Sequence, residues 1–145
     1  MTTTVVRRSD TALYPLHPLH AFFLAGLIPL FLAALISDCA YWSTYHLQWK
    51  NFASWLLVGA LVFNGLAWLG SIVSLMRVER RAGQALAYFL LLLATWVLGF
   101  INSLVHAKDA WASMPTGLVL SVITVILACA ATWMGLASWR TGGVK

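Results

Sequence analysis

Charged residues are scarce in this sequence. Of its 145 residues only nine are Lys or Arg and four are Asp or Glu, while 61% are hydrophobic. Soluble domains carry a charge at about a quarter of their positions. The composition therefore excludes a cytosolic enzyme, a secreted disulfide scaffold and a disordered tail, and it indicates a protein that lies in a membrane.

Cysteines and catalytic motifs are also scarce. The two cysteines, Cys39 and Cys129, lie inside apolar segments without the spacing of a zinc or redox motif. The sequence has no glycine-rich phosphate loop, no HExxH pair and no nucleophile elbow. The net charge of +5 is spread along the chain, so nucleic acid is not an expected partner. We do not expect an enzyme that acts by itself on a soluble substrate.

The chain has four long apolar runs instead. They cover about 19–42, 52–76, 85–106 and 115–139. A helix needs about 20 apolar residues to cross a hydrocarbon core about 30 Å thick. Strands of a membrane barrel would alternate apolar and polar residues, which these runs do not. The sequence therefore predicts an all-α, multi-pass membrane protein, with one domain over residues 1–145 and four helices in an antiparallel up-down bundle.

Lysine and arginine predict the orientation of this bundle. Seven of the nine basic residues lie on the side shared by the N-terminus, the second connection and the C-terminus, and only Lys50 and Lys108 lie opposite. Basic residues stay cytoplasmic during insertion, so we expect both termini in the cytoplasm. The first apolar run is about twice as long as the core of a signal peptide, so it is interpreted as a retained helix.

Small and polar residues recur at helical spacing along the second, third and fourth runs. Small residues let helices approach closely in a membrane, and polar side chains form hydrogen bonds between helices. These faces predict a compact bundle with a polar interior. The predicted polar face contains Asn64, Thr95, Asn102, Ser121 and Thr124.

Ionisable residues at membrane depth are costly and are therefore candidates for function. Asp38 lies near the end of the first run, His46 lies in the first connection, and His106 and Asp109 close the third run. Because all four lie opposite the termini, they are candidates for one His/Asp cluster. Imidazole and carboxylate ligate transition metals, and a pair of histidines ligates b-type haem. The candidate metal ligands are His46, His106 and Asp38.

Other interpretations of these residues remain open. The two acids can pair with Lys50, Lys108 or a neighbouring tyrosine. Alternatively, His106 can bond Asp109, which follows it by three residues on a helix. The cluster can also belong to a path for protons or a substrate.

His17 and His20 stand among prolines at the start of the first run. His20 and Asp38 are 18 residues apart, which is five helical turns, so they share a face at a separation of about 27 Å. No other histidine faces His17 and His20, which argues against bis-histidine haem there and favours a role as helix caps. His20 nevertheless joins Asp38, His46, His106 and Asp109 as a candidate binding residue.

Evidence for an internal repeat is weak. Asp38 precedes Trp42 near the end of the first run, and Asp109 precedes Trp111 after the third. Two such coincidences do not predict the repeats found in transporters.

Several short motifs lie between about Tyr14 and Gly143. They are Pro18-Leu19-His20, Ser37-Asp38, Tyr41-Trp42, the segment 48–55, Val105-His106, Asp109, Trp111, Pro115-Thr116-Gly117-Leu118 and Ser121. Together these motifs resemble a bacterial inner-membrane family, the domain-of-unknown-function 2231 family. The resemblance implies four helices in a bacterial inner membrane and no defined chemistry. It also suits an anchor or electron-transfer partner of periplasmic dehydrogenases and c-type cytochromes.

Three functional hypotheses follow. The first is an integral-membrane binding or anchoring module in the lipid bilayer, acting for a periplasmic oxidoreductase such as a dehydrogenase or cytochrome c. In this hypothesis the His/Asp cluster holds a b-type haem, a transition metal or a quinone. The second is a small permease or proton-linked channel, and the third is a structural or assembly subunit. A thin bundle of this size also suits a homo-oligomer.

Overall fold

The computed structural model describes residues 17–77, 82–108 and 110–140. Four long helices account for most of these residues, and no strand occurs within the same ranges. Each long helix is long and apolar enough to cross a membrane. The chain is therefore an all-α polytopic membrane protein, which confirms the predicted fold class. The helices are α1 (Pro18–Thr44), α2 (Leu47–Arg77), α3 (Ala82–His106), the short α4 (Ala110–Ser113) and α5 (Thr116–Arg140).

The helices extend beyond most of the predicted apolar runs. Only Tyr45 and His46 separate α1 from α2, where a connection of nine residues was expected. Tyr45 ends α1 in the left-handed conformation, with φ of 53°, and its N–H donates to the Tyr41 carbonyl at 2.8 Å. This cap reverses the chain within one residue, so the polar residues that follow already belong to α2. The third expected connection likewise contains a helical turn, α4.

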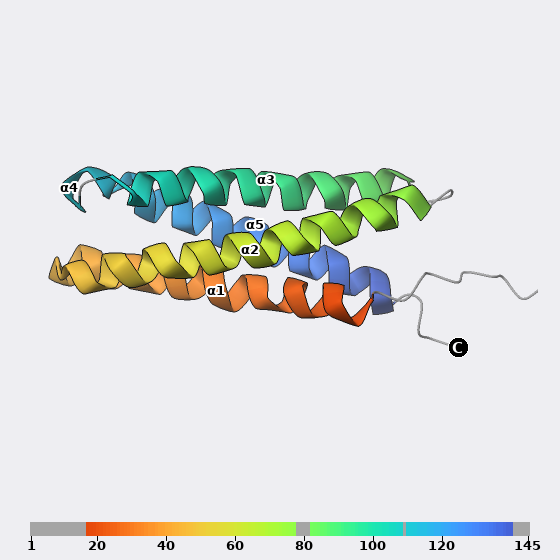
Figure 1. Ribbon diagram of the computed structural model, residues 1–145, viewed down its shortest axis with the longest axis horizontal. Coiled ribbons are helices and arrows are strands. Elements are labelled where there is room, and N and C mark those ends of the chain that lie inside the picture. The colour runs from red at the N-terminus through yellow and green to blue at the C-terminus, as the bar shows by residue number, and fades with distance from the viewer. Residues whose placement is uncertain (1–16, 78–81, 109, 141–145) are drawn as a thin grey trace, which may run out of the picture.

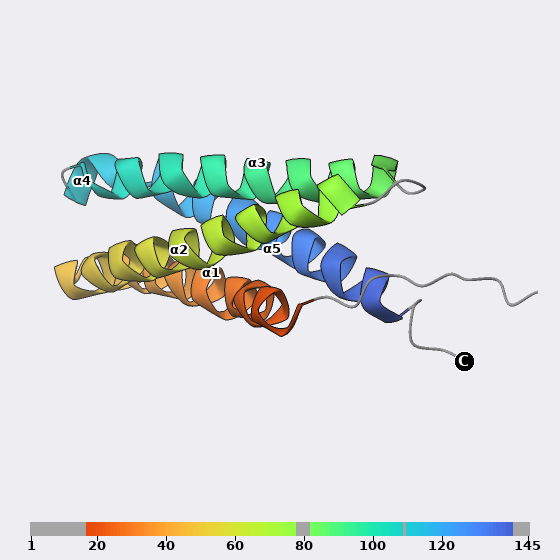
Figure 2. The same cartoon turned by 45° about the vertical axis from the view of Figure 1, so that its right-hand side comes forward.

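The four long helices form an up-down bundle (Figures 1 and 2). The colours show that α1 and α3 run in one direction and that α2 and α5 run in the other. Contacts join α1 to α2, α2 to α3, α3 to α5 and α5 to α1, so α1 and α3 face each other diagonally. α1 begins and α5 ends at one end of the bundle, which we call the His20 end. The opposite end, which carries α4, is called the Asp38 end.

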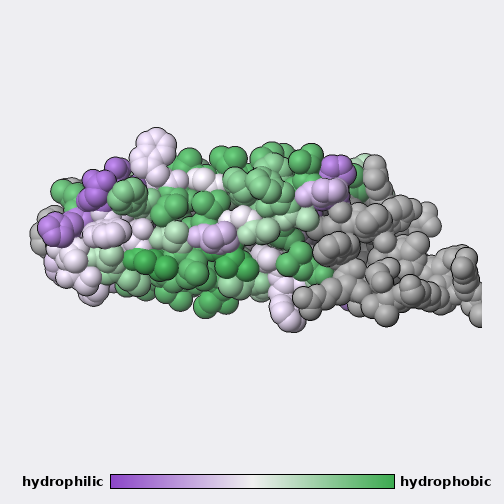
Figure 3. All heavy atoms as spheres, turned by 90° about the horizontal axis from the view of Figure 1, so that it is seen from below, coloured by the Kyte–Doolittle hydropathy of each residue, from purple (hydrophilic) through white to green (hydrophobic). Residues whose placement is uncertain are grey.

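Large apolar side chains fill the centre of the bundle. Leu24, Leu27, Phe31, Leu57 and Leu92 are all at most 1% exposed. The outside is also apolar, as Figure 3 shows for the face seen there, where hydrophobic residues cover the middle and hydrophilic ones gather at one end. Hydrophobic residues outside a bundle are stable against lipid but not against water. The distribution is that of a membrane bundle.

Buried positions repeat from the first pair of helices to the second. Most buried positions of α1 and α2 have a buried counterpart 68 residues later, on α3 or α5. Leu57 is an exception, because its counterpart Val125 is only half-buried. Only two of the ten pairs below are identical residues, so the repeat lies in burial and not in sequence. The two helical hairpins are therefore related by an approximate two-fold axis along the bundle. The pairs are Leu24/Leu92, Leu27/Thr95, Phe31/Gly99, Ala34/Asn102, Ser37/Val105, Asp38/His106, Ala53/Ser121, Ala60/Ala128, Asn64/Thr132 and Ala67/Gly135.

Candidate functional site

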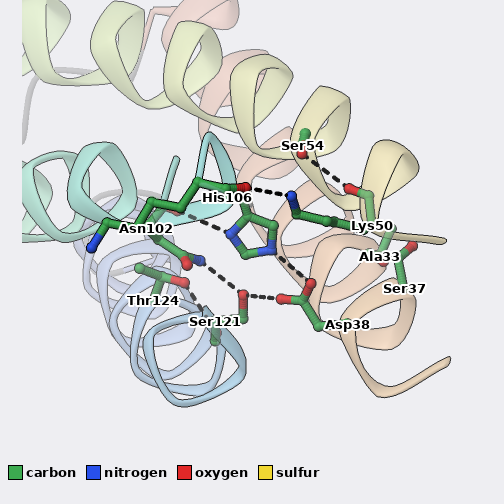
Figure 4. A network of polar contacts seen from close by, with 10 residues as sticks. Ala33, Ser37, Asp38, Lys50, Ser54, Asn102, His106, Ser121 and Thr124 are labelled. Atoms are coloured by element: carbon green, nitrogen blue, oxygen red, sulfur yellow. Dashed lines mark hydrogen bonds and ion pairs between the residues drawn. The ribbon is translucent and has the colours of Figure 1, made fainter. Parts of the chain in front are cut away.

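Three helices bring polar side chains together at the Asp38 end (Figure 4). α1 supplies Asp38, α3 supplies Asn102 and His106, and α5 supplies Ser121. Asn102 and His106 are one turn apart, so they project from the same face of α3. The side chains of Asp38 and His106 are 0% and 1% exposed. We call these four residues the Asp38 network.

Hydrogen bonds join the Asp38 network into one chain. The Asn102 amide donates to the Ser121 hydroxyl at 2.8 Å, and that hydroxyl donates to Oδ2 of Asp38. Nε2 of His106 lies 2.8 Å from Oδ1 of Asp38. Both carboxylate oxygens therefore have a partner, as a carboxyl group away from water requires.

The backbone determines where the protons of His106 lie. Nδ1 of His106 lies 3.0 Å from the backbone oxygen of Asn102, and because a carbonyl oxygen can only accept, Nδ1 carries a proton. One further proton then lies in the bond between Nε2 and Asp38. The pair is either imidazolium with carboxylate or neutral imidazole with carboxylic acid, and it has no net charge in either form.

A glycine and a lysine complete the surroundings of His106. A Cβ atom on Gly117 would lie 2.9 Å from Cε1 of His106, so α5 can approach the ring only because residue 117 is glycine. The Lys50 ammonium donates to the Lys108 backbone oxygen at 2.7 Å, and it is close enough to interact electrostatically with His106. This bond joins the start of α2 to the end of α3 (Figure 4).

Of the other predicted candidates at this end, His46 does not join the Asp38 network. His46 is exposed in the α1–α2 connection, where its backbone N–H bonds the Thr44 hydroxyl at 3.4 Å. Asp109 lies outside the described residues. Within those residues no group of three or more His, Cys, Asp or Glu could hold a metal ion. The structure thus brings together Asp38 and His106 from the predicted His/Asp cluster.

His20 takes part in a separate contact at the other end of the bundle. Its Nε2 lies 2.9 Å from the hydroxyl of Tyr88 on α3. An added Cβ on Gly70 would collide with the His20 ring, and one on Gly135 would collide with Leu24 and lie 3.1 Å from the Tyr88 hydroxyl. His17 caps α1, with Nδ1 accepting from the Leu19 N–H at 3.3 Å, in agreement with its interpretation as a cap.

The five residues of the predicted polar face all lie in the interior, each at most 1% exposed. Asn102 and Ser121 belong to the Asp38 network. Thr95 and Thr124 donate to carbonyl oxygens of their own helices, those of Leu91 and Ser121. Asn64 differs, because neither its amide nitrogen nor its oxygen has a partner among the described residues.

Two contacts were not predicted from the sequence. The sequence predicts that Ser121 lies on the polar face, but not that it bonds the Asp38 carboxylate. It also does not predict the contact of Tyr88 with His20. A signal for both diagonal pairs exists, since Tyr88 and His106 have the same 18-residue separation as His20 and Asp38. Asp38 bonds His106 and Ser121, and within the described part of the chain neither a lysine nor a tyrosine is among its hydrogen-bond partners.

The arrangement of donors tests the three candidate cofactors. A haem iron or a transition metal needs a free ring nitrogen, and both nitrogens of His106 are already hydrogen-bonded. These residues therefore do not fit either group as they are arranged. Among the described residues the Asn102 side chain forms one hydrogen bond, to Ser121, and its oxygen has no partner. Its second amide hydrogen could donate to a quinone carbonyl, which can only accept, whereas its oxygen would need a donor such as a quinol hydroxyl.

Fold and site together define a polytopic helical membrane protein with a buried, uncharged hydrogen-bonded network near one end. The model of the DUF2231 family, described as predicted membrane proteins, matches residues 16–145. The chain therefore belongs to this family, in agreement with the resemblance of its motifs. No curated protein and no solved structure matches the chain.

Proposed function

We propose that the protein is an integral-membrane anchoring module, and that the Asp38 network holds its helices together. One observation carries this proposal: within the described residues, the hydrogen bonds of the Asp38 and His106 side chains are all made inside the bundle. Buried polar groups that satisfy one another across three helices stabilise one arrangement of those helices. The apolar outer surface supports a place among lipids.

We further propose that a partner binds at the Asp38 end. Trp42, Tyr45 and Trp49 are 46%, 56% and 40% exposed there. Aromatic residues are favoured at the level of lipid headgroups and in protein interfaces, and Lys108 is exposed at the same end. In the finer form of the proposal this end faces the periplasm of a bacterial inner membrane. Its partner is then an oxidoreductase, such as a dehydrogenase or cytochrome c.

Electron transfer through this chain is the most specific form of the proposal. It requires a bound redox group, and the hydrogen-bonding capacity of Asn102 favours a quinone over haem or metal. Such a quinone would supply the redox chemistry, while Asn102 would orient its headgroup. An optical spectrum, metal analysis and lipid extraction of the purified protein test this form. We expect quinone to co-purify and to be lost in Asn102→Leu, and a Soret band or stoichiometric metal would contradict it.

A permease for a solute and a purely structural subunit are less well supported. A permease for a solute needs a water-accessible route, and the centre of the described bundle is packed with Leu24, Leu27 and Phe31. A purely structural subunit would need no surface for a partner, so the exposed aromatic residues at the Asp38 end favour anchoring.

Site-specific photo-cross-linking in membranes tests the anchoring proposal. We expect a photoreactive residue at Trp49 to capture a protein that carries a haem or dehydrogenase cofactor. The matched control is Met76, which is 83% exposed at the His20 end and should capture no such protein. Capture at Met76 alone, or of no redox protein at either position, would refute a partner at the Asp38 end.

A further inference from the structure

The two diagonal hydrogen bonds of the bundle occupy equivalent positions in its two halves. His20 bonds Tyr88 and Asp38 bonds His106, and in each pair the second residue follows the first by 68 positions. A two-fold axis relates each residue of the first hairpin to its equivalent in the second, at the same distance on the opposite side. Two equivalent residues can therefore touch each other only next to this axis. Both pairs therefore lie on the approximate two-fold axis, one near each end. The rise of an α-helix separates them by about 27 Å.

Each of these pairs shares an exchangeable proton. Between Asp38 and His106 the proton lies on either Oδ1 or Nε2, as the bond from Nδ1 to the Asn102 carbonyl requires. Between His20 and Tyr88, either the phenol donates to Nε2 or the ring N–H donates to the oxygen. Both pairs can thus receive a proton on one side and give one up on the other.

Buried polar atoms without partners lie between the two pairs. Asn64 is 0% exposed, and neither atom of its amide has a partner among the described residues; the same holds for the side-chain oxygen of Asn102. Asn64 precedes Gly70, which packs against His20, by six residues, or about 9 Å along α2. An unpartnered buried amide destabilises the fold, so a group that forms hydrogen bonds at this level is favourable.

We propose that protons cross the bundle along this axis, in steps between the Asp38–His106 pair and the His20–Tyr88 pair. Transient water molecules, hydrogen-bonded by Asn102 and Asn64, carry the proton between them. One proton enters at one pair and one leaves at the other, so only N–H and O–H bonds form and break and no co-reactant is needed. The charged or titratable neighbours are Lys50 beside His106 and His17 beside His20.

The apolar side chains on the axis make this path selective. Leu24, Leu27 and Phe31 are fully packed between the two pairs, and they exclude a standing column of water. Solutes and hydrated ions are therefore excluded, whereas a proton needs only a short-lived chain of hydrogen bonds. Phe31 is the largest of these side chains and fits against Gly99, where a Cβ would lie 3.3 Å from its ring.

Proton flux into proteoliposomes tests the proposal directly. The purified full chain is reconstituted with an internal pH-sensitive dye, and a potassium diffusion potential set by valinomycin drives the flux. We expect the wild type to acidify the vesicles faster than protein-free vesicles do. Asp38→Asn should return the rate to that background, because the amide keeps a similar shape but holds no exchangeable acid proton. Ser43→Ala, which removes an exposed hydroxyl bonded only to its own helix, should conduct like the wild type.

Two further variants keep the proposal testable if Asp38→Asn fails to fold. Asn64→Leu removes an amide without partners and should lower the flux while leaving the helical circular dichroism unchanged. Phe31→Ala opens space on the axis and should raise the flux. Wild-type flux equal to that of protein-free vesicles, or full flux in Asn64→Leu, would overturn the proposal. Neither result bears on anchoring, which is tested by cross-linking in membranes.

Discussion

The neutral pair of Asp38 and His106 is the residue-scale feature with the clearest energetic consequence. A buried charge that loses its partner cannot regain water, so removing one partner costs more than the pair contributes as a whole. Their bond also links α1 to α3, which are diagonal to each other and make few other contacts.

His106→Ala tests the contribution of this pair. We expect the free energy of unfolding to fall by about 3 kcal/mol or more, because Asp38 is left buried without its main donor. Asp38→Asn should cost less, about 1–2 kcal/mol, since an amide can still bond Ser121. Unfolding in mixed detergent measures both, with Ser43→Ala as the control. A loss in His106→Ala no larger than in Ser43→Ala would contradict the role of the network in stability.

The glycine beside His106 provides a second residue-scale test. Gly117 and Gly83 are each the second residue of a long helix, but only Gly117 touches His106, and nothing lies within 4 Å of a Cβ on Gly83. Gly117→Ala should displace the imidazole and lower the melting temperature. Gly83→Ala should leave it unchanged or raise it slightly, because alanine favours a helix by up to about 1 kcal/mol. Equal melting temperatures for the two variants would show that the ring is not held by α5.

The sequence predicts how deep in the membrane these residues lie, but not which of them come into contact. Asp38 and His106 were expected on the same side of the membrane because each lies near the same end of an apolar run. His46 is equally close in sequence, but the left-handed residue Tyr45 turns the chain there and leaves His46 exposed. Whether Ser121 meets Asp38 depends on how each helix is rotated about its own axis in the bundle. Hydrophobicity does not indicate this rotation, because the surrounding lipid is as apolar as the core of the bundle.

At the scale of elements, the bond from Lys50 to Lys108 joins the start of α2 to the end of α3. Lys108 lies two residues beyond His106, the last residue of α3, and its N–H bonds the Val105 carbonyl. The lysine side chain therefore forms a charged hydrogen bond with the turn that follows α3, where a cation near the end of the helix is favourable.

Hydrogen exchange tests this contact between elements. Lys50→Met should speed exchange of the Ala107 and Lys108 amides, which bond Ser103 and Val105 at the end of α3. Lys108→Met is a close control, because the acceptor is the backbone oxygen of residue 108 and survives the substitution. Slower or unchanged exchange in Lys50→Met would show that α3 ends without help from the lysine.

The number and type of elements were predictable, whereas their ends were not. Apolar length indicates where a helix crosses the hydrocarbon core, but helices continue into the headgroup region wherever their hydrogen bonds remain satisfied. Residues 47–51 are helical although they contain Gln48, Lys50 and Asn51. The caps at His17 and Tyr45, rather than hydropathy, mark the ends of α1.

At the scale of the whole molecule, the distribution of lysine and arginine predicts a cytoplasmic position for both termini. The structure agrees in one respect, since α1 begins and α5 ends at the same end of the bundle (Figure 1). Which end faces the cytoplasm depends on charges, several of which lie outside the described residues.

Reporter fusions test the predicted orientation. A fluorescent protein fused after Lys145 should fluoresce and alkaline phosphatase at the same position should be inactive, because basic residues remain in the cytoplasm. Phosphatase inserted between Tyr45 and His46, in the connection at the Asp38 end, should be active. The reverse pattern at both positions would exchange the two sides and place the Asp38 end in the cytoplasm.

The approximate two-fold axis has a consequence for how such a site can arise. In a dimer of identical hairpins, each position on the axis meets its own copy, so Asp38 would oppose a second aspartate and the two carboxyl groups would compete for one proton. A single chain with two unlike halves escapes that restriction, because its second half can carry a base opposite the acid. Joining the halves in one polypeptide thus permits complementary chemistry at a place where symmetry would impose identity.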